Sequence, residues 1–227
     1  MHSHRDAEIF SYILSGELTH RDSTVKKEAG GEDKKLFYRM KRGDVQFSSA
    51  GSGVKHSENN ESAMESVRFL QIWVLPWKKG LAPVYHTQTF GEEEKRKGFQ
   101  TIISPMKGGM DATLQQEKMP EGMVSGTIPI HADFLFGAGI IPVGETFLWK
   151  VAGGEGVVTS KENRQVYVYL PMMKEGKAKV RLNGSDDAIL EEGDGAFVRS
   201  VDEGDELGIE SIGEEEAEVV VLDANHN

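Results

Sequence analysis

The chain has 227 residues, a net charge of −11 and a pI near 5.2. Such an acidic surface repels a phosphate backbone, so we expect no direct contact with nucleic acid. No apolar run approaches the roughly 18 residues that span a bilayer, so we expect no membrane partner. There is no cysteine, which excludes disulfides and thiolate metal ligands and favours an intracellular protein.

In chain order, the first half predicts short β-strands that are joined by tight turns. Residues 8–14 are rich in strand-forming side chains, and the Ser15-Gly16 turn connects them to a second strand at 17–22. This pattern predicts a β-hairpin. The polar segment 23–35 predicts a surface loop. Further strands are expected at residues 36–40, 45–47 and 67–75.

The second half has the same strand-and-turn character. A polar segment at 81–98, with a run of charges at 92–97, predicts a linker between a domain at 1–80 and a domain at 99–227. The apolar, glycine-rich run 131–141 predicts a buried strand or a contact between the domains. Further strands are expected at residues 146–151, 165–170, 177–182, 195–198, 206–212 and 218–223.

A short internal repeat favours a duplicated β-barrel. Residues 42–47 (RGDVQF) resemble residues 192–197 (EGDGAF), and in both a Gly-Asp turn lies between two expected strands. The potential metal ligands of the first half are not repeated in the second. We therefore expect an all-β chain of two related barrels, of which only the first binds a metal.

Those potential ligands come in two pairs, His2-Ser3-His4 and His56-Ser57-Glu58. Alternate residues of a strand point to the same face, so each pair offers two ligands to one point. Three imidazoles and a carboxylate suit iron, manganese, nickel, copper or zinc. The glycine-rich turn at 50–53 lets the strand bend and bring its ligands across the barrel mouth. The alternative is a surface cluster of histidines at the chain end.

Other histidines and the aromatic residues give weaker signals. His20 is expected to make a polar contact at a strand or turn edge, and His86 and His131 have no partner at ligand spacing. Aromatic residues in strands pack in the core by default, and a pocket over the metal is the alternative for five of them. These five are Phe10, Tyr12, Phe47, Phe69 and Trp73.

Four segments resemble the pirin family of the cupin superfamily. They are HSHRDAEIFSY at 2–12, HRDS at 20–23, RGDVQ at 42–46 and AGSGVKHSE at 50–58. The resemblance is dense over residues 2–76 and looser in the second half. It implies two tandem cupin-type, jelly-roll β-barrels with a metal in the first. The ligands that it implies are His2, His4, His56 and Glu58, with Fe(II) as the expected metal and other divalent transition metals as alternatives.

Pirins carry several dozen residues before the first of these histidines, so the resemblance leads us to expect a first barrel that lacks its opening strands. It also implies one of two functions. The first is a quercetin 2,3-dioxygenase, in which Glu58 is the base for a flavonol hydroxyl and oxygen adds across the ring with release of carbon monoxide. The second is a non-catalytic, redox-sensitive transcription co-regulator that acts through protein partners. The resemblance implies a location in the cytoplasm or the nucleus.

Overall fold

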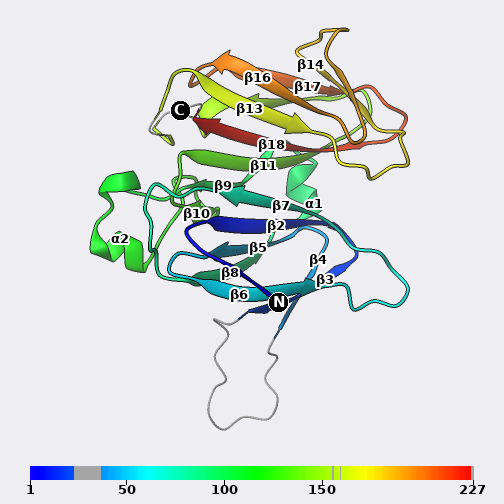
Figure 1. The fold of residues 1–227 in the computed structure, drawn as a ribbon. Helices are drawn as coiled ribbons and strands as arrows, with labels where there is room; N and C mark the ends of the chain where they lie inside the picture. The colour runs from blue at the N-terminus through cyan, green and yellow to red at the C-terminus, as the bar shows by residue number, and fades with distance from the viewer. Residues whose placement is uncertain (23–36, 155, 159, 226–227) are drawn as a thin grey trace. The chain divides into compact units, whose positions relative to one another are not determined.

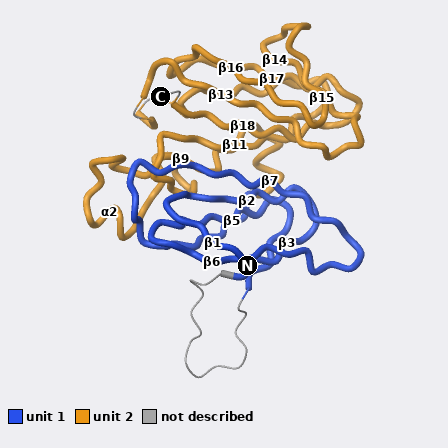
Figure 2. Tube along the Cα trace, in the orientation of Figure 1, with its two compact units in different colours: residues 1–90 blue, residues 91–227 orange. Residues whose placement is uncertain are grey.

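The computed structural model describes residues 1–22, 37–154, 156–158 and 160–225, so the loop expected at 23–35 lies outside the described residues. The chain divides into two compact units, residues 1–90 and 91–227 (Figure 2). Strands dominate both units, which confirms the predicted all-β class (Figure 1). None of the described helices is long and apolar enough to cross a membrane.

Unit 1 is built from two antiparallel sheets that face each other. The first has the order β1 (His2–His4), β6 (Val54–Asn59), β3 (Glu17–Asp22) and β4 (Tyr38–Lys41). The second has the order β7 (Arg68–Val74), β2 (Glu8–Ser15), β5 (Asp44–Ser49) and β8 (Val84–Thr89). Apolar side chains from both sheets pack between them, among them buried Ile13 of β2 with Leu18 of β3 and Met40 of β4.

The prediction of a β-hairpin across Ser15-Gly16 is wrong. Strands β2 and β3 both form, but they lie in different sheets, so the turn carries the chain from one sheet to the other. Gly16 has φ +73°, and a Cβ there would lie 2.3 Å from the carbonyl oxygen of Ser66. A tight glycine turn therefore indicates that the chain changes direction. It does not indicate whether the two strands that it connects pair with each other.

The segment expected as a linker, 81–98, contains regular structure. It holds β8, which pairs along its whole length with β5, and the short helix α1 (Glu92–Lys95). Its polar sequence fits a strand at the edge of its sheet with several exposed side chains. The two units divide between the buried Phe90 and Gly91.

Unit 2 also contains two sheets. The larger has the order β10 (Ile128–Ile130), β9 (Gln100–Pro105), β11 (Phe134–Ile141), β18 (Ala217–Asn225), β13 (Arg164–Tyr169) and β16 (Gly195–Val201). The smaller has the order β12 (Thr146–Lys150), β17 (Glu206–Ser211), β14 (Lys179–Leu182) and β15 (Ile189–Glu191). Besides α1, unit 2 contains the short helices η1 (Gly109–Asp111), α2 (Leu114–Lys118) and η2 (Val151–Gly153). All six strands expected between 146 and 223 are present, and the run 131–141 contains the fully buried β11.

The internal repeat corresponds to a repeated piece of structure. Gly43 and Gly193 both have positive φ, and the aspartate after each accepts a hydrogen bond from a backbone N–H three residues earlier. In both units the turn leads from an edge strand of one sheet into the other sheet, from β4 to β5 and from β15 to β16. The sheet orders then match strand by strand, β1-β6-β3-β4 with β12-β17-β14-β15 and β7-β2-β5 with β18-β13-β16.

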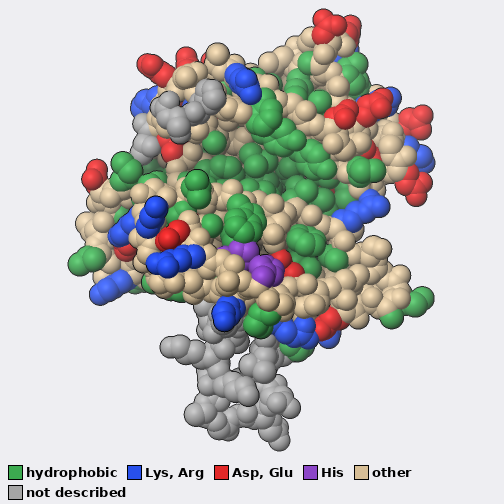
Figure 3. Space-filling model, in the orientation of Figure 1, with side chains coloured by type: hydrophobic (Ala, Val, Ile, Leu, Met, Phe, Trp, Pro, Cys, Tyr) green, Lys and Arg blue, Asp and Glu red, His purple; other side chains and the backbone are tan. Residues whose placement is uncertain are grey.

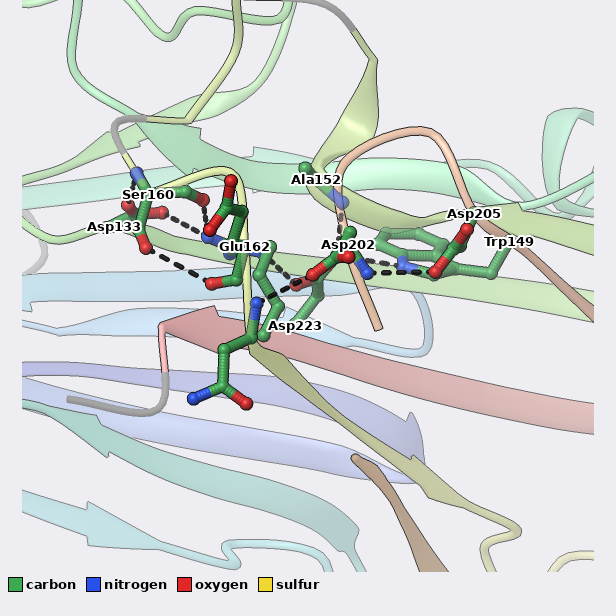
Figure 4. Close-up of polar contacts among 10 residues, drawn as sticks. Asp133, Trp149, Ala152, Ser160, Glu162, Asp202, Asp205 and Asp223 are labelled. Atoms are coloured by element: carbon green, nitrogen blue, oxygen red, sulfur yellow. Dashed lines mark hydrogen bonds and ion pairs between the residues drawn. The ribbon is translucent and has the colours of Figure 1, made fainter. Parts of the chain in front are cut away.

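A buried ionic network ties the strands of unit 2 together (Figure 4). The fully buried Arg164 donates from Nε to Asp223 at 2.7 Å and from Nη1 to Asp133 at 2.8 Å. The other oxygen of Asp223 accepts hydrogen bonds from Trp149 Nε1 at 3.1 Å and from the backbone N–H of Ala152 at 2.7 Å. Each charge is paired, which is the condition for keeping such groups in a protein interior.

Replacing Arg164 with methionine should strongly destabilise the fold, because it leaves two carboxylates with little solvent and no cation. We expect the free energy of unfolding to fall by about 3–5 kcal/mol, measured by denaturant titration. Arg199→Met, on the exposed face of β16, is the matched control and should change stability little. Equal stability of the two variants would contradict this account of the network.

Candidate metal site

Strand pairing brings the two predicted ligand pairs together. Strands β1 and β6 run antiparallel, with His2 opposite His56 and His4 opposite Val54. The turn that leads into β6 is fixed by Gly51, where a Cβ would lie 1.9 Å from the carbonyl oxygen of Leu81. No other residue fits at that position without moving the chain, so this glycine sets where β6 begins.

Three imidazoles converge on one point, and we call His2, His4 and His56 the histidine cluster. The Nε2 atom of His56 lies 2.7 Å from Nε2 of His4 and 2.9 Å from Nε2 of His2. All three ligand atoms lie within 4.8 Å of one another. The ring centroids are 4.5–4.6 Å apart with the rings nearly perpendicular, so the nitrogens point inward.

The electrostatics of the histidine cluster suit a bound cation. His4 and His56 are buried, whereas His2 is exposed. Burial, followed by the charge of His2, lowers the pKa of His4, and the Glu58 carboxylate acts in the opposite direction. A lowered pKa favours the neutral imidazole, which is the form that binds metals. Three imidazole nitrogens on paired strands therefore fit a transition metal such as iron, nickel or zinc.

Glu58, the fourth predicted ligand, lies beside the histidine cluster and is not part of it. One oxygen of its carboxylate accepts a hydrogen bond from Ser11 Oγ at 3.1 Å, and the other accepts one from Gln71 Nε2 at 2.6 Å. Ser11 on β2 and Gln71 on β7 are directly opposite each other in the second sheet of unit 1. The structure thus brings three of the four predicted ligands together and places the fourth between the two sheets.

His20 is closer to the site than its sequence indicated. It lies on β3, a central strand, and is fully buried rather than at an edge. Its ring is 5.0 Å from that of His56 and stacks on Tyr85 at 4.9 Å, and its Nδ1 is 4.0 Å from the Glu58 carboxylate. No local pattern signals this contact, because it depends on the pairing of His20 with Glu58 across β3 and β6.

The aromatic residue Trp73 borders the histidine cluster. Its side chain is 56% exposed, and its ring centroid lies 4.6 Å from that of His4. Phe10, Tyr12 and Phe47 are buried in the core, as expected by default. Figure 3 shows histidine side chains reaching the surface next to hydrophobic ones.

A hollow of about 520 Å³ lies along β1 and the start of β6 and reaches one member of the cluster, His4. It is lined by Ser3, His4, Arg5, Gly53, Val54 and Lys55. The other histidines singled out, His86 and His131, lie outside the cluster. No sequence pattern singles out Gln71 or Ser11, because their role arises from a contact between sheets.

Comparison with known proteins gives sequence matches to part of the chain and structural matches to nearly all of it. Residues 1–74 match the family model described as Pirin. The quercetin 2,3-dioxygenase of Escherichia coli K12 is 36% identical over 104 residues, which is 46% of this chain and 39% of that protein. The chain thus aligns with about two fifths of the length of this curated relative.

Solved structures match over nearly the whole chain. The crystal structure of YhhW from Escherichia coli has a TM-score of 0.69 at 24% identity and covers 99% of this chain and 74% of that one. The bacterial pirin YhhW in complex with nickel(II) has a TM-score of 0.67 at 24% identity, covering 98% and 74%. At this identity the likeness shows the fold, and it confirms the predicted tandem cupin architecture.

Removing one imidazole from the histidine cluster should remove most of its affinity for a transition metal. We expect His56→Ala to retain little nickel(II) or iron(II) after loading and desalting, because two donors remain where three converged. Metal analysis of the purified protein gives the measurement. His86→Ala, an exposed residue of β8, should load as the wild type does. Equal metal content in the His56 variant would contradict the site.

Proposed function

We propose that the protein is a metal-dependent dioxygenase of the quercetin 2,3-dioxygenase type, because residues 1–74 match the Pirin family model and the Escherichia coli quercetin 2,3-dioxygenase is a relative. The observation that carries this proposal is the convergence of the Nε2 atoms of His2, His4 and His56. Fe(II) is the proposed metal. Nickel(II) is the alternative, since a pirin of similar fold is known in complex with it.

The histidine cluster would hold the metal, and Glu58 is the fourth donor within reach. A bound divalent metal supplies Lewis acidity to the oxygen atoms of a ligand. The pairing of β1 with β6 would hold the imidazoles in register before a metal binds. This supports a site with coordination positions left for a substrate and for oxygen.

Glu58 is the proposed general base. Its side chain is 10% exposed, and each carboxylate oxygen accepts one hydrogen bond from the protein. Each oxygen therefore has a lone pair left to accept a proton from the hydroxyl of a bound substrate. Ser11 and Gln71 would keep the carboxylate oriented during that transfer.

The proposed substrate is a flavonol-like small molecule. The exposed indole of Trp73 at the cluster offers a flat apolar surface against which a planar aromatic ring can pack. The adjoining hollow of about 520 Å³ is within the size range of small-molecule sites. A planar hydroxylated ring would place its oxygen atoms towards the imidazoles and its apolar face towards Trp73.

A second candidate is a non-catalytic metal-binding protein that acts on transcription through protein partners. The observation that favours it is an aromatic patch on unit 2, where Phe197 is 58% exposed and adjoins Tyr167. A hollow of about 320 Å³ lies in the same region. Exposed aromatic patches often mark protein interfaces. Under both candidates the protein is located in the cytoplasm or the nucleus. A pull-down tests the second candidate: an identical set of protein partners for the ferrous, ferric and metal-free forms would count against it.

Iron(II)-loaded protein should consume oxygen when quercetin is added and release carbon monoxide in equal amount. Metal is loaded without oxygen and its content is verified, after which an oxygen electrode and gas analysis follow the reaction. Glu58→Gln should lower the turnover rate about 10²–10⁴-fold, because the base is lost. Glu65→Gln, an exposed residue of the same unit, is the matched control. No oxygen uptake by fully loaded wild-type protein would refute the dioxygenase.

A further inference from the structure

The Glu58 carboxylate is held by two side chains of the opposite sheet, Ser11 and Gln71, which we call the carboxylate dock. Both donate hydrogen bonds to it, and the 2.6 Å bond from Gln71 is short for an N–H donor. The amide of Gln71 is itself oriented, because its oxygen accepts a hydrogen bond from Trp73 Nε1 at 3.3 Å. The amide nitrogen is therefore turned towards Glu58.

The dock lies next to the histidine cluster. Glu58 is two residues from His56 on the same strand, so both side chains leave β6 on the same face. The carboxylate acts on His4 through its charge, and it lies 4.0 Å from His20, whose ring neighbours that of His56. The docked carboxylate is thus a neighbour of the cluster on the same face of β6.

The repeated fold offers an internal comparison. Aligned through the shared turn and strand pairing, the cluster positions of unit 1 correspond to apolar residues in unit 2. Trp149 takes the place of His2, Val151 that of His4 and Leu207 that of His56.

The positions of the carboxylate dock are also occupied by apolar residues in unit 2. Ser11 and Gln71, opposite each other on β2 and β7, correspond to Val168 and Val221, opposite each other on β13 and β18. Both valines are fully buried in the core of unit 2. Where the fold lacks the histidines it also lacks the dock, so the general demands of the fold do not explain a polar pair at these positions.

We propose that Ser11 and Gln71 are positioning residues that compete with the bound metal for the Glu58 carboxylate. While docked, the carboxylate leaves a coordination position open and stays available to accept a proton from an incoming hydroxyl. Once released, it would serve as a fourth ligand of the metal and occupy that position. This inference rests on the proposed metal site and goes beyond it by assigning the residues that decide which state Glu58 occupies.

Gln71→Leu tests the proposal, because leucine keeps a side chain of similar length and removes the donor. We expect the dissociation constant for cobalt(II) to fall by about three- to tenfold, since the carboxylate is freed to bind the metal. The visible absorption bands of the cobalt(II) protein should also change, because the ligand set changes. Ser11→Ala should shift both readouts in the same direction by less.

Two further variants separate this effect from a general change in structure. Adding Glu58→Gln to Gln71→Leu should abolish the gain in affinity and the spectral change, because no carboxylate is left to release. Gln88→Leu, on β8 of the same unit, should bind cobalt(II) as the wild type does.

Unchanged or weaker cobalt(II) binding by Gln71→Leu, with an unchanged spectrum, would overturn the competition. Should that variant unfold, Ser11→Ala with the same two readouts decides. Failure of the wild type to bind cobalt(II), nickel(II) or iron(II) would instead overturn the metal site itself.

Discussion

The antiparallel register of β1 and β6 is the constraint on which the candidate site depends. With His2 opposite His56, the two side chains leave the sheet on the same face, and His4 joins them from two residues further along β1. A slip of one residue would turn one strand's ligands to the other face and separate the pairs. The register is held in part by the glycine turn before β6, where the backbone of Leu81 leaves no room for a side chain at Gly51. Backbone packing at one turn thus fixes where imidazoles meet several residues later.

Duplication of the fold shows what the site requires beyond a cupin-type barrel. The two units share strand order, pairing and the Gly-Asp turn, yet the same register positions hold histidines in unit 1 and large apolar residues in unit 2. Unit 2 places its buried polar groups elsewhere, in the fully paired network of Arg164, Asp133 and Asp223. A paired network can be buried without a ligand, whereas three imidazoles with converging nitrogens are a donor set that suits a cation. The barrel therefore supplies positions, and the residues at those positions determine the chemistry.

Much of this arrangement could be predicted from the sequence where the determinant is local. The spacing of His2, His4 and His56 indicated convergence because strand periodicity is regular, and the repeated Gly-Asp turn indicated the duplication. The hairpin at Ser15-Gly16 was predicted wrongly because a glycine turn does not specify whether the next strand pairs or crosses to the other sheet. Strand β8 was predicted as part of a linker because the sequence of this edge strand is polar. His20, Ser11 and Gln71 had no local signal, since their contacts join strands that are distant in sequence.

Those non-local contacts give unit 1 an unusual interior. A sandwich of this size gains most of its stability from apolar side chains between its sheets, as unit 2 does with Trp149, Val151 and Leu207. Unit 1 fills the matching space with imidazoles, a carboxylate, an amide and a hydroxyl, so the sheets there meet through directional bonds. Directional bonds hold each group at one angle and release it when a competing partner appears, which close-packed apolar contacts do not do. The same polar interior that lowers apolar burial in unit 1 therefore makes its carboxylate a group whose position a ligand can change.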